Sequence, residues 1–226
     1  TDPENKIFTP ERSEFHERML DKMLPEDTIA EEGTRPVMVM LIGTPGSGKG
    51  TAGNPYIEKF SKDMGIKLGN INADTVKEHS PEYRGWNSAA LHEESSIVAE
   101  KYGMSRALDR GHHFLFDATG ANTDKMRDLA EKFGKTHDIH MVHVDVPPEE
   151  TGYRAWDRFQ KNAFDWDARG ENAAARAKGE KITGPTRWVP PDYAFNMGVE
   201  GKVDTTYATL KGSEHVRSWV SLSNNE

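Results

Sequence analysis

The chain has 226 residues, of which 35% are hydrophobic and 29% charged, with a formal net charge of -8. This length suits one α/β domain spanning residues 1–226, and the acidic balance disfavours long nucleic acid as a partner because it repels phosphate backbones. The absence of cysteine excludes disulfides and thiolate metal sites. No apolar stretch approaches the roughly 20 residues that cross a bilayer, so we expect a soluble, cytoplasmic protein with no membrane partner.

The first predicted elements are a helix and a buried strand. Residues 1–30 form a helical extension, in which 9–24 place Phe15, Met19 and Met23 on one face at helical spacing. The run VMVMLI at Val37–Ile42 is continuous and apolar, which is typical of a strand buried on both faces of a parallel sheet.

A glycine-rich loop follows this strand, from Gly43 to Thr51, and then a helix is predicted at 57–64. Proline in a helix interior costs about 3 kcal/mol. The segment Gly53-Asn54-Pro55 therefore predicts one short turn, after which the helix restarts with Asn54 as its cap.

The rest of the chain alternates strands with helices. Strands are predicted at 66–71, 114–116, 139–146 and, last, 203–210; helices are predicted at 91–109, 123–133 and 149–164. Such alternation indicates βαβ units and a three-layer α/β/α sandwich with a mainly parallel sheet of about five strands. With the glycine-rich loop directly after its first strand, we predict a fold class of the P-loop NTPase type. Residues 160–186 are rich in Ala, Gly and charge without an apolar face, and we interpret them as a mobile insertion or lid.

The loop after the first strand carries the chemistry of phosphate binding. Glycines let consecutive backbone N–H groups converge on phosphate oxygens, and a lysine reaches the β- and γ-phosphates. The alternative, an ordinary glycine turn, does not account for the strand and the lysine together. The candidate ATP-binding residues are Gly43, Pro45, Gly46, Ser47, Gly48, Lys49, Gly50 and Thr51.

This loop departs from the usual pattern at one position. A Ser or Thr normally follows the lysine and holds Mg²⁺, but here that residue is Gly50. Thr51, one position later, is therefore the candidate metal-ligating hydroxyl.

Two aspartates follow the second and third predicted strands. Asp74 is the candidate general base for an acceptor hydroxyl, and Asp117 is the candidate carboxylate on the Mg²⁺ side. Each also has a structural alternative, because Asp74 could cap the next helix and Asp117 could cap a turn.

Further polar residues could complete a phosphotransferase site. Glu94 and Thr119 are candidate substrate contacts, although Glu94 could equally lie on a solvated helix face. Arg154 and Arg158 share one helix face, and Arg187 follows the insertion. We assign Arg154 to the substrate and Arg158 and Arg187 to catalysis, with surface ion pairing as the alternative. His137, His140 and His143 do not predict a metal site, because side chains on a strand alternate.

Together these segments resemble the zeta toxin and UDP-N-acetylglucosamine kinase family. The matching motifs are PGSGKGT at 45–51, NADTVKEHSPEY at 72–83, HEESS at 92–96, the pattern from Gly111 to Gly120, the arginine pair, and RWVP at 187–190. The resemblance implies an ATP-dependent small-molecule kinase. It implies that Asp74 is the base, that Lys49 binds ATP, that Glu94 and Thr119 lie at the substrate, and that Arg158 and Arg187 clamp phosphates. Asp117 stands where some members have Glu.

The leading hypothesis is transfer of the ATP γ-phosphate to a nucleotide sugar, with an antitoxin as a possible protein partner. A nucleic-acid or nucleotide kinase is the second hypothesis. A third is an NTP-driven switch without an acceptor, which Asp74 disfavours. The sequence lacks an Asp-Gly-Phe-Pro-Arg segment, which disfavours a nucleoside monophosphate kinase.

Overall fold

Five parallel strands form one sheet at the centre of the molecule. The computed structural model describes residues 8–84, 87–163 and 189–224, without the side chains of 158–163. The strand order is β2-β3-β1-β4-β5, and every pairing is parallel. The strands are β1 (Val37–Ile42), β2 (Gly69–Ile71), β3 (Phe114–Ala118), β4 (Asp138–Asp145) and β5 (Val216–Ser223). The predicted fold class is confirmed.

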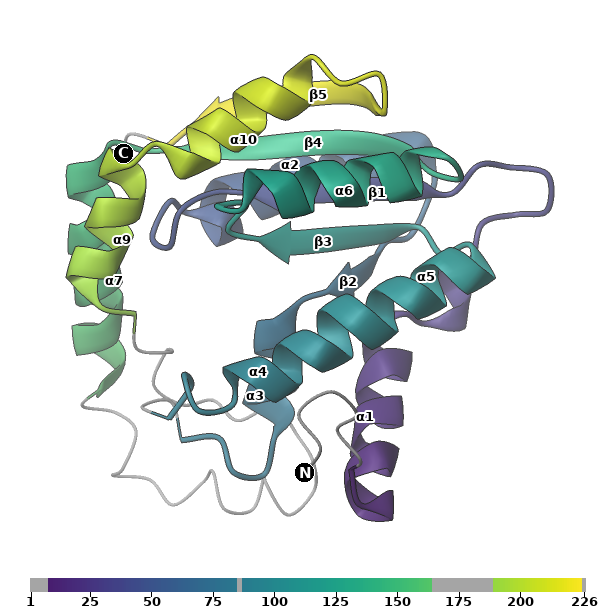
Figure 1. Cartoon of the computed structure of the whole chain (residues 1–226), viewed down its shortest axis with the longest axis horizontal. Helices are drawn as coiled ribbons and strands as arrows, with labels where there is room; N and C mark the ends of the chain where they lie inside the picture. Colours follow the sequence, from purple (N-terminus) through teal and green to yellow (C-terminus); the bar gives the residue numbers. More distant parts are fainter. Residues whose placement is uncertain (1–7, 85–86, 164–188, 225–226) are drawn as a thin grey trace.

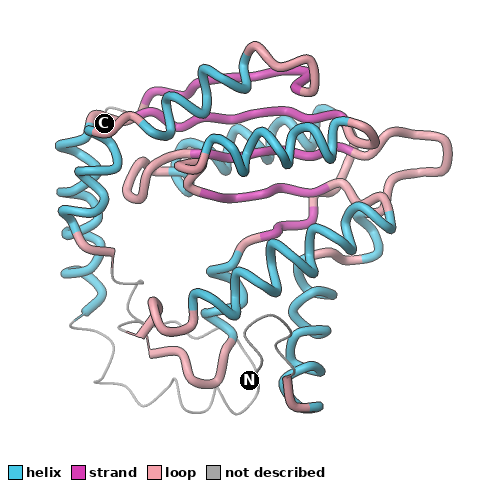
Figure 2. Tube along the Cα trace, in the orientation of Figure 1, coloured by secondary structure: helices cyan, strands magenta, loops and turns pink. Residues whose placement is uncertain are grey.

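Helices cover both faces of this sheet, which makes three layers (Figure 1). They are α1 (Pro10–Met23), α2 (Asn54–Met64), α3 (Ala73–His79), α4 (His92–Ser96), α5 (Met104–Arg110), α6 (Thr123–Gly134), α7 (Pro148–Ala163), α9 (Pro191–Val199) and α10 (Lys202–Lys211). The π-helical segment η2 (Lys49–Gly53) leads from the glycine-rich loop into α2, and a second one, η3 (Ile97–Gly103), joins α4 to α5 in one continuous helical run (Figure 2). The segment η1 (Glu26–Thr28) is a 3₁₀ turn. Within the described ranges, no helix is long and apolar enough to cross a membrane.

The central strand β1 is buried along its whole length, as its apolar run predicts. Met38 and Met40 pack in the larger core, which α1, η3, α5, α6 and α10 also line. Val39 and Leu41 point the other way, into a smaller core with Ile57 of α2. This strand therefore fixes the loop that follows it between two packed layers.

The N-terminal helix α1 also matches its prediction. Thr9 caps it by accepting a hydrogen bond from the backbone N–H of Arg12, and Pro10 is its first residue. Phe15, Met19 and Met23 are buried on one face, as their spacing predicts.

Two predictions of secondary structure are wrong. Residues 203–210 form helix α10, and the last strand is β5 at 216–223. Val203, Thr206 and Leu210 are the buried residues of α10, at helical spacing. Packing of this helical face against α6 and β5 decides the structure of the segment.

The expected restart of a helix at Asn54 is also wrong, because Asn54 is itself helical and its side chain caps nothing. The wide π turn η2 runs directly into α2, with the N–H of Asn54 bonded to the carbonyl of Lys49. A π turn gives the ring of Pro55 room that a regular α turn lacks, so the chain stays helical.

Candidate active site

The glycine-rich loop lies at the carboxyl end of β1, between β1 and η2. Gly46 and Gly48 both have φ near +86°, a left-handed conformation that favours glycine. The N–H of Gly43 donates to the carbonyl of Thr119, 3.2 Å away, which ties the start of the loop to the segment after β3. The loop therefore has the backbone of an anion-binding nest.

Two distant segments pack directly on the glycines of this loop. A Cβ on Gly46 would overlap the carbonyl oxygen of Thr151, on α7. A Cβ on Gly48 would overlap the Nδ2 of Asn224, just after β5. That amide donates to the carbonyl of Ser47 at 3.0 Å. Asn224 was missed in the sequence because no local motif links it to the loop.

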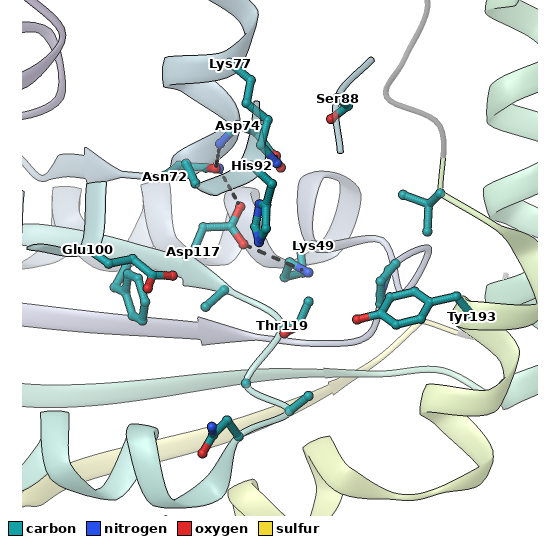
Figure 3. Close-up of a pocket in the computed structure, with 18 of the residues that line it drawn as sticks. Lys49, Asn72, Asp74, Lys77, Ser88, His92, Glu100, Asp117, Thr119 and Tyr193 are labelled. Carbon is teal, nitrogen blue, oxygen red and sulfur yellow. Dashed lines mark hydrogen bonds and ion pairs between the residues drawn. The ribbon is translucent and has the colours of Figure 1, made fainter. Parts of the chain in front are cut away.

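A chain of polar contacts runs from the loop to the predicted base (Figure 3). The ammonium of Lys49 donates to the carbonyl of Gly43 at 2.7 Å and lies 4.0 Å from the Oδ1 of Asp117. The other oxygen of Asp117 accepts from Asn72 at 3.1 Å. The side-chain oxygen of Asn72 in turn accepts from the backbone N–H of Asp74 at 2.8 Å.

Asn72 thus caps helix α3 and holds Asp117, so the capping role considered for Asp74 belongs to Asn72. Asp74 is the second residue of α3, and its Oδ1 lies 3.1 Å from the ammonium of Lys77. Burial raises the pKa of Asp117 above its usual range, although the positive charge of Lys49 opposes this. Burial lowers the pKa of Lys77, although Glu78 opposes this.

A cavity of about 610 Å³ opens between the loop and these carboxylates. The predicted residues Pro45, Lys49, Asp74, Asp117 and Thr119 all line it. Helices α3, α4, α6 and α9 and the segments beside them supply its other walls. The lining residues that the sequence did not single out include Asn72, Lys77, Ser88, His92, Asn122, Lys125 and Tyr193. One cavity therefore joins the phosphate loop to the candidate base.

The two candidate Mg²⁺ ligands, Asp117 and Thr51, lie in different surroundings. Asp117 lines the cavity, with its Oδ1 4.0 Å from the ammonium of Lys49. The hydroxyl of Thr51 instead donates to the carbonyl of Gly48 at 3.1 Å. Gly50 has open space where a Cβ would lie, so the fold itself does not demand glycine there.

The structure does not place Glu94 at the cavity. Its carboxylate accepts from Arg12, with Nε–Oε1 and Nη2–Oε2 distances of 2.5 and 3.0 Å, and lies 2.6 Å from the Nε2 of His16. Burial raises the pKa of Glu94, but these hydrogen bonds outweigh burial and hold it below its usual range. In this arrangement Glu94 anchors helix α1 against α4, so its predicted contact with a substrate is not found.

Of the three predicted arginines, the structure describes the side chain of Arg154. Arg154 lies on α7, 3.4 Å from the carboxylate of Glu150, and is not among the described residues that line the cavity. Position 158 also belongs to α7, but the side chain of Arg158 lies outside the described part of the chain. Arg187 and residues 164–186 of the predicted insertion lie outside it as well.

The histidines separate as strand alternation predicts. His140 contacts Phe60 on the α2 side of the sheet, with ring centroids 4.8 Å apart, whereas His143 stacks on Tyr207 of α10. His143 lies beside Asp145 and Asp204, and one potential metal-ligating atom from each of the three residues lies within 4.8 Å of the others.

A family model described as Zeta toxin matches residues 21–198. A search of curated proteins finds no match. Among solved structures, the fold is similar to one from the PezAT chromosomal toxin-antitoxin system of Streptococcus pneumoniae. The TM-score is 0.66 and the identity 12%, covering 97% of this chain and 79% of the other.

Two further structures share the fold at low identity. One is the AvrRxo1-ORF1:-ORF2 complex with ATP, with TM-score 0.59, 17% identity, and coverage of 100% of this chain and 66% of the other. The second is the Pnkp1/Rnl/Hen1 RNA repair complex, with TM-score 0.51, 18% identity, and coverage of 80% and 48%. The chain thus spans about two thirds of the former and about half of the latter.

Proposed function

The chain belongs to the zeta toxin family, and on that premise we propose that it is an ATP-dependent kinase acting on a small-molecule hydroxyl. The proposed acceptor is the sugar of a nucleotide sugar such as UDP-N-acetylglucosamine. One observation carries the proposal: the phosphate loop with Lys49 and the carboxylate of Asp74 line the same cavity.

The residues of the loop fit the phosphates of ATP. Gly46 and Gly48 have the left-handed backbone of an anion nest, and a Cβ on either would collide with a neighbouring segment. Lys49 lies at the same place with its ammonium beside Asp117. Asp117 would hold Mg²⁺, which would supply charge neutralisation at the β- and γ-phosphates. Thr51 is proposed as a second ligand, for which its hydroxyl would have to leave the carbonyl of Gly48.

In the proposed reaction, Asp74 orients the acceptor hydroxyl and receives its proton. A bond forms between the acceptor oxygen and the γ-phosphorus, while the bond from that phosphorus to the bridging oxygen breaks and leaves ADP. Lys49 and the loop N–H groups stabilise charge on the phosphates. Arg158 and Arg187 are proposed to clamp phosphates.

The cavity also supports a sugar-sized acceptor. Its 610 Å³ lies within the usual range of about 300–1,000 Å³ for small-ligand pockets. Ser88, His92 and Asn122 offer hydrogen bonds, and Tyr193 offers an aromatic face. Because one similar structure comes from a toxin-antitoxin system, we also propose an antitoxin as a protein partner, with action in the cytoplasm.

The test is incubation with magnesium ATP and a panel of acceptors, with products read by mass spectrometry. The panel contains UDP-N-acetylglucosamine, other nucleotide sugars, NAD, nucleosides, and short DNA and RNA ends. Asp74→Asn is compared with Asp63→Asn, which alters an exposed aspartate paired with Lys59. We expect phosphorylated nucleotide sugar from the wild type and from Asp63→Asn, and a loss of about 100-fold or more in Asp74→Asn.

Two results would redirect the proposal. Phosphorylation of an oligonucleotide end instead would favour a polynucleotide kinase, a reading consistent with the likeness to a chain of an RNA repair complex. Equal ATP consumption by wild type and Asp74→Asn, with no acceptor modified, would remove Asp74 from the role of base.

A further inference from the structure

Lys77 is a buried lysine in the wall of the cavity, one turn of helix after Asp74. Its side chain is 6% exposed, and its ammonium lies 3.1 Å from the Oδ1 of Asp74. Burying an ammonium is costly unless a specific partner compensates. A lysine held at this depth beside the candidate base therefore calls for an explanation beyond the packing of α3.

The geometry points to Lys77 as a positioning residue that orients the carboxylate of Asp74 and keeps it ionised for the acceptor hydroxyl. This inference rests on the proposed function, because it assigns Lys77 a task in that reaction.

Asp74 is held from two sides. Asn72 accepts a hydrogen bond from the backbone N–H of Asp74 at 2.8 Å, which fixes the start of α3. Lys77 donates to Oδ1 from the next turn. With one oxygen held by the ammonium, the carboxylate has a defined orientation in the wall of the cavity that it lines.

The charged and titratable groups around Lys77 support this role. On α3 they are Asp74 and Glu78, and on α4 His92, which also lines the cavity. Burial, followed by the charge of Lys77, lowers the pKa of His92. On α1, the ammonium of Lys22 lies against His79 rather than Lys77. Asp74 directly accepts a hydrogen bond from Lys77.

A purely structural ion pair would behave differently from a positioning residue. Removal of a structural partner would lower stability and leave the pH dependence of turnover in place. Removing an ammonium that lies 3.1 Å from the base should raise the pKa of the Asp74 carboxylate by about 1–3. The acid limb of the pH–rate profile therefore separates the two roles.

The experiment measures kcat/KM against pH with magnesium ATP and UDP-N-acetylglucosamine for wild type, Lys77→Met and Lys77→Arg. Lys59→Met, which removes an exposed lysine paired with Asp63, is the matched control. For Lys77→Met we expect kcat to fall about 10- to 100-fold, the acid limb to move to higher pH, and KM for ATP to stay within about threefold. Lys77→Arg should restore the position of the limb, and Lys59→Met should match wild type. An unmoved limb in a folded Lys77→Met protein would overturn the inference.

A second measurement needs no acceptor and so separates this inference from the proposed function. Lysines are ¹³C-methylated, and the NMR signal of Lys77 is identified by its loss in Lys77→Arg. If Lys77 donates to Asp74, its pKa in Asp74→Asn should fall by about one unit or more relative to wild type. An unchanged pKa would refute the pairing even in an active kinase. A fall in pKa together with no phosphorylation of any acceptor would leave the pairing in place and reject the proposed reaction.

Discussion

Two glycines of the phosphate loop, two positions apart, should respond in opposite ways to the same substitution. Gly48 has a φ of +86°, and a Cβ there would overlap the amide of Asn224 and come within 2.8 Å of the Oγ1 of Thr51. Gly50 is not among the glycines with positive φ, and nothing lies within 4 Å of its Cβ position. Comparing alanine at these two positions therefore tests whether the loop needs a left-handed backbone at Gly48.

The cost of Gly48→Ala has two sources. A left-handed alanine costs about 1–2 kcal/mol. Displacing the amide of Asn224 also breaks its 3.0 Å hydrogen bond to the carbonyl of Ser47, which is worth about 1 kcal/mol. If the total of about 2–3 kcal/mol falls on the binding conformation of the loop, magnesium ATP should bind roughly 30- to 150-fold more weakly. Gly50→Ala lies in a helical turn and should instead stabilise the protein by about 0.5–1 kcal/mol.

The assay is calorimetric titration with magnesium ATP, accompanied by thermal unfolding to verify that each variant is folded. Asn224→Ala and the double variant complete a cycle, in which Gly48→Ala should cost about 1 kcal/mol less in the Asn224→Ala background than in wild type, because the hydrogen bond is already absent there. If Gly48→Ala binds ATP as wild type does, or if Gly50→Ala is equally impaired, the reasoning from φ and space is wrong.

Three further predictions concern stability. Burial raises the pKa of Asp117, so the folded state favours the protonated carboxyl. The stability that this form provides is present below the pKa of the unfolded state and is lost as pH rises through the pKa of the folded state. Asp117→Asn should therefore melt higher than wild type at pH 7 while losing magnesium-dependent ATP binding; a lower melting temperature would contradict this. Arg12→Met leaves the carboxylate of Glu94 partly buried without its main partner and should cost about 2 kcal/mol in denaturant unfolding. Arg18→Met, which breaks an exposed pair on the same helix, should cost under about 0.5 kcal/mol, and equal effects would exclude an anchoring role. Burial lowers the pKa of His137 to about 4, so the stability that neutral His137 provides is present above about pH 6.5 and is lost toward pH 4, by about 3 kcal/mol. His137→Phe should flatten that part of the pH–stability curve, and an unchanged slope would argue against it.

The sequence alone determined the centre of this fold. The apolar run of β1, the glycines after it and the lysine between them specify a buried strand and a phosphate loop, because each signal is local. The cap at Thr9 and the spacing of Phe15 and Met19 likewise specify α1. Asp74, Asp117 and Thr119 follow parallel strands in the sequence, and they line one cavity because those strand ends meet at one edge of the sheet.

Only the tertiary structure decided which residues meet across the chain. The sequence of 203–210 did not distinguish a strand from a helix until one helical face was buried, and the edge strand β5 carries little apolar alternation. Asn224 contacts Ser47, 177 positions away in the sequence, and Glu94 contacts Arg12, 82 positions away. No local sequence pattern predicts either contact. Neighbouring residues determine helix and strand periodicity and turn conformation. The partner of a polar side chain depends instead on how the helices pack against the sheet.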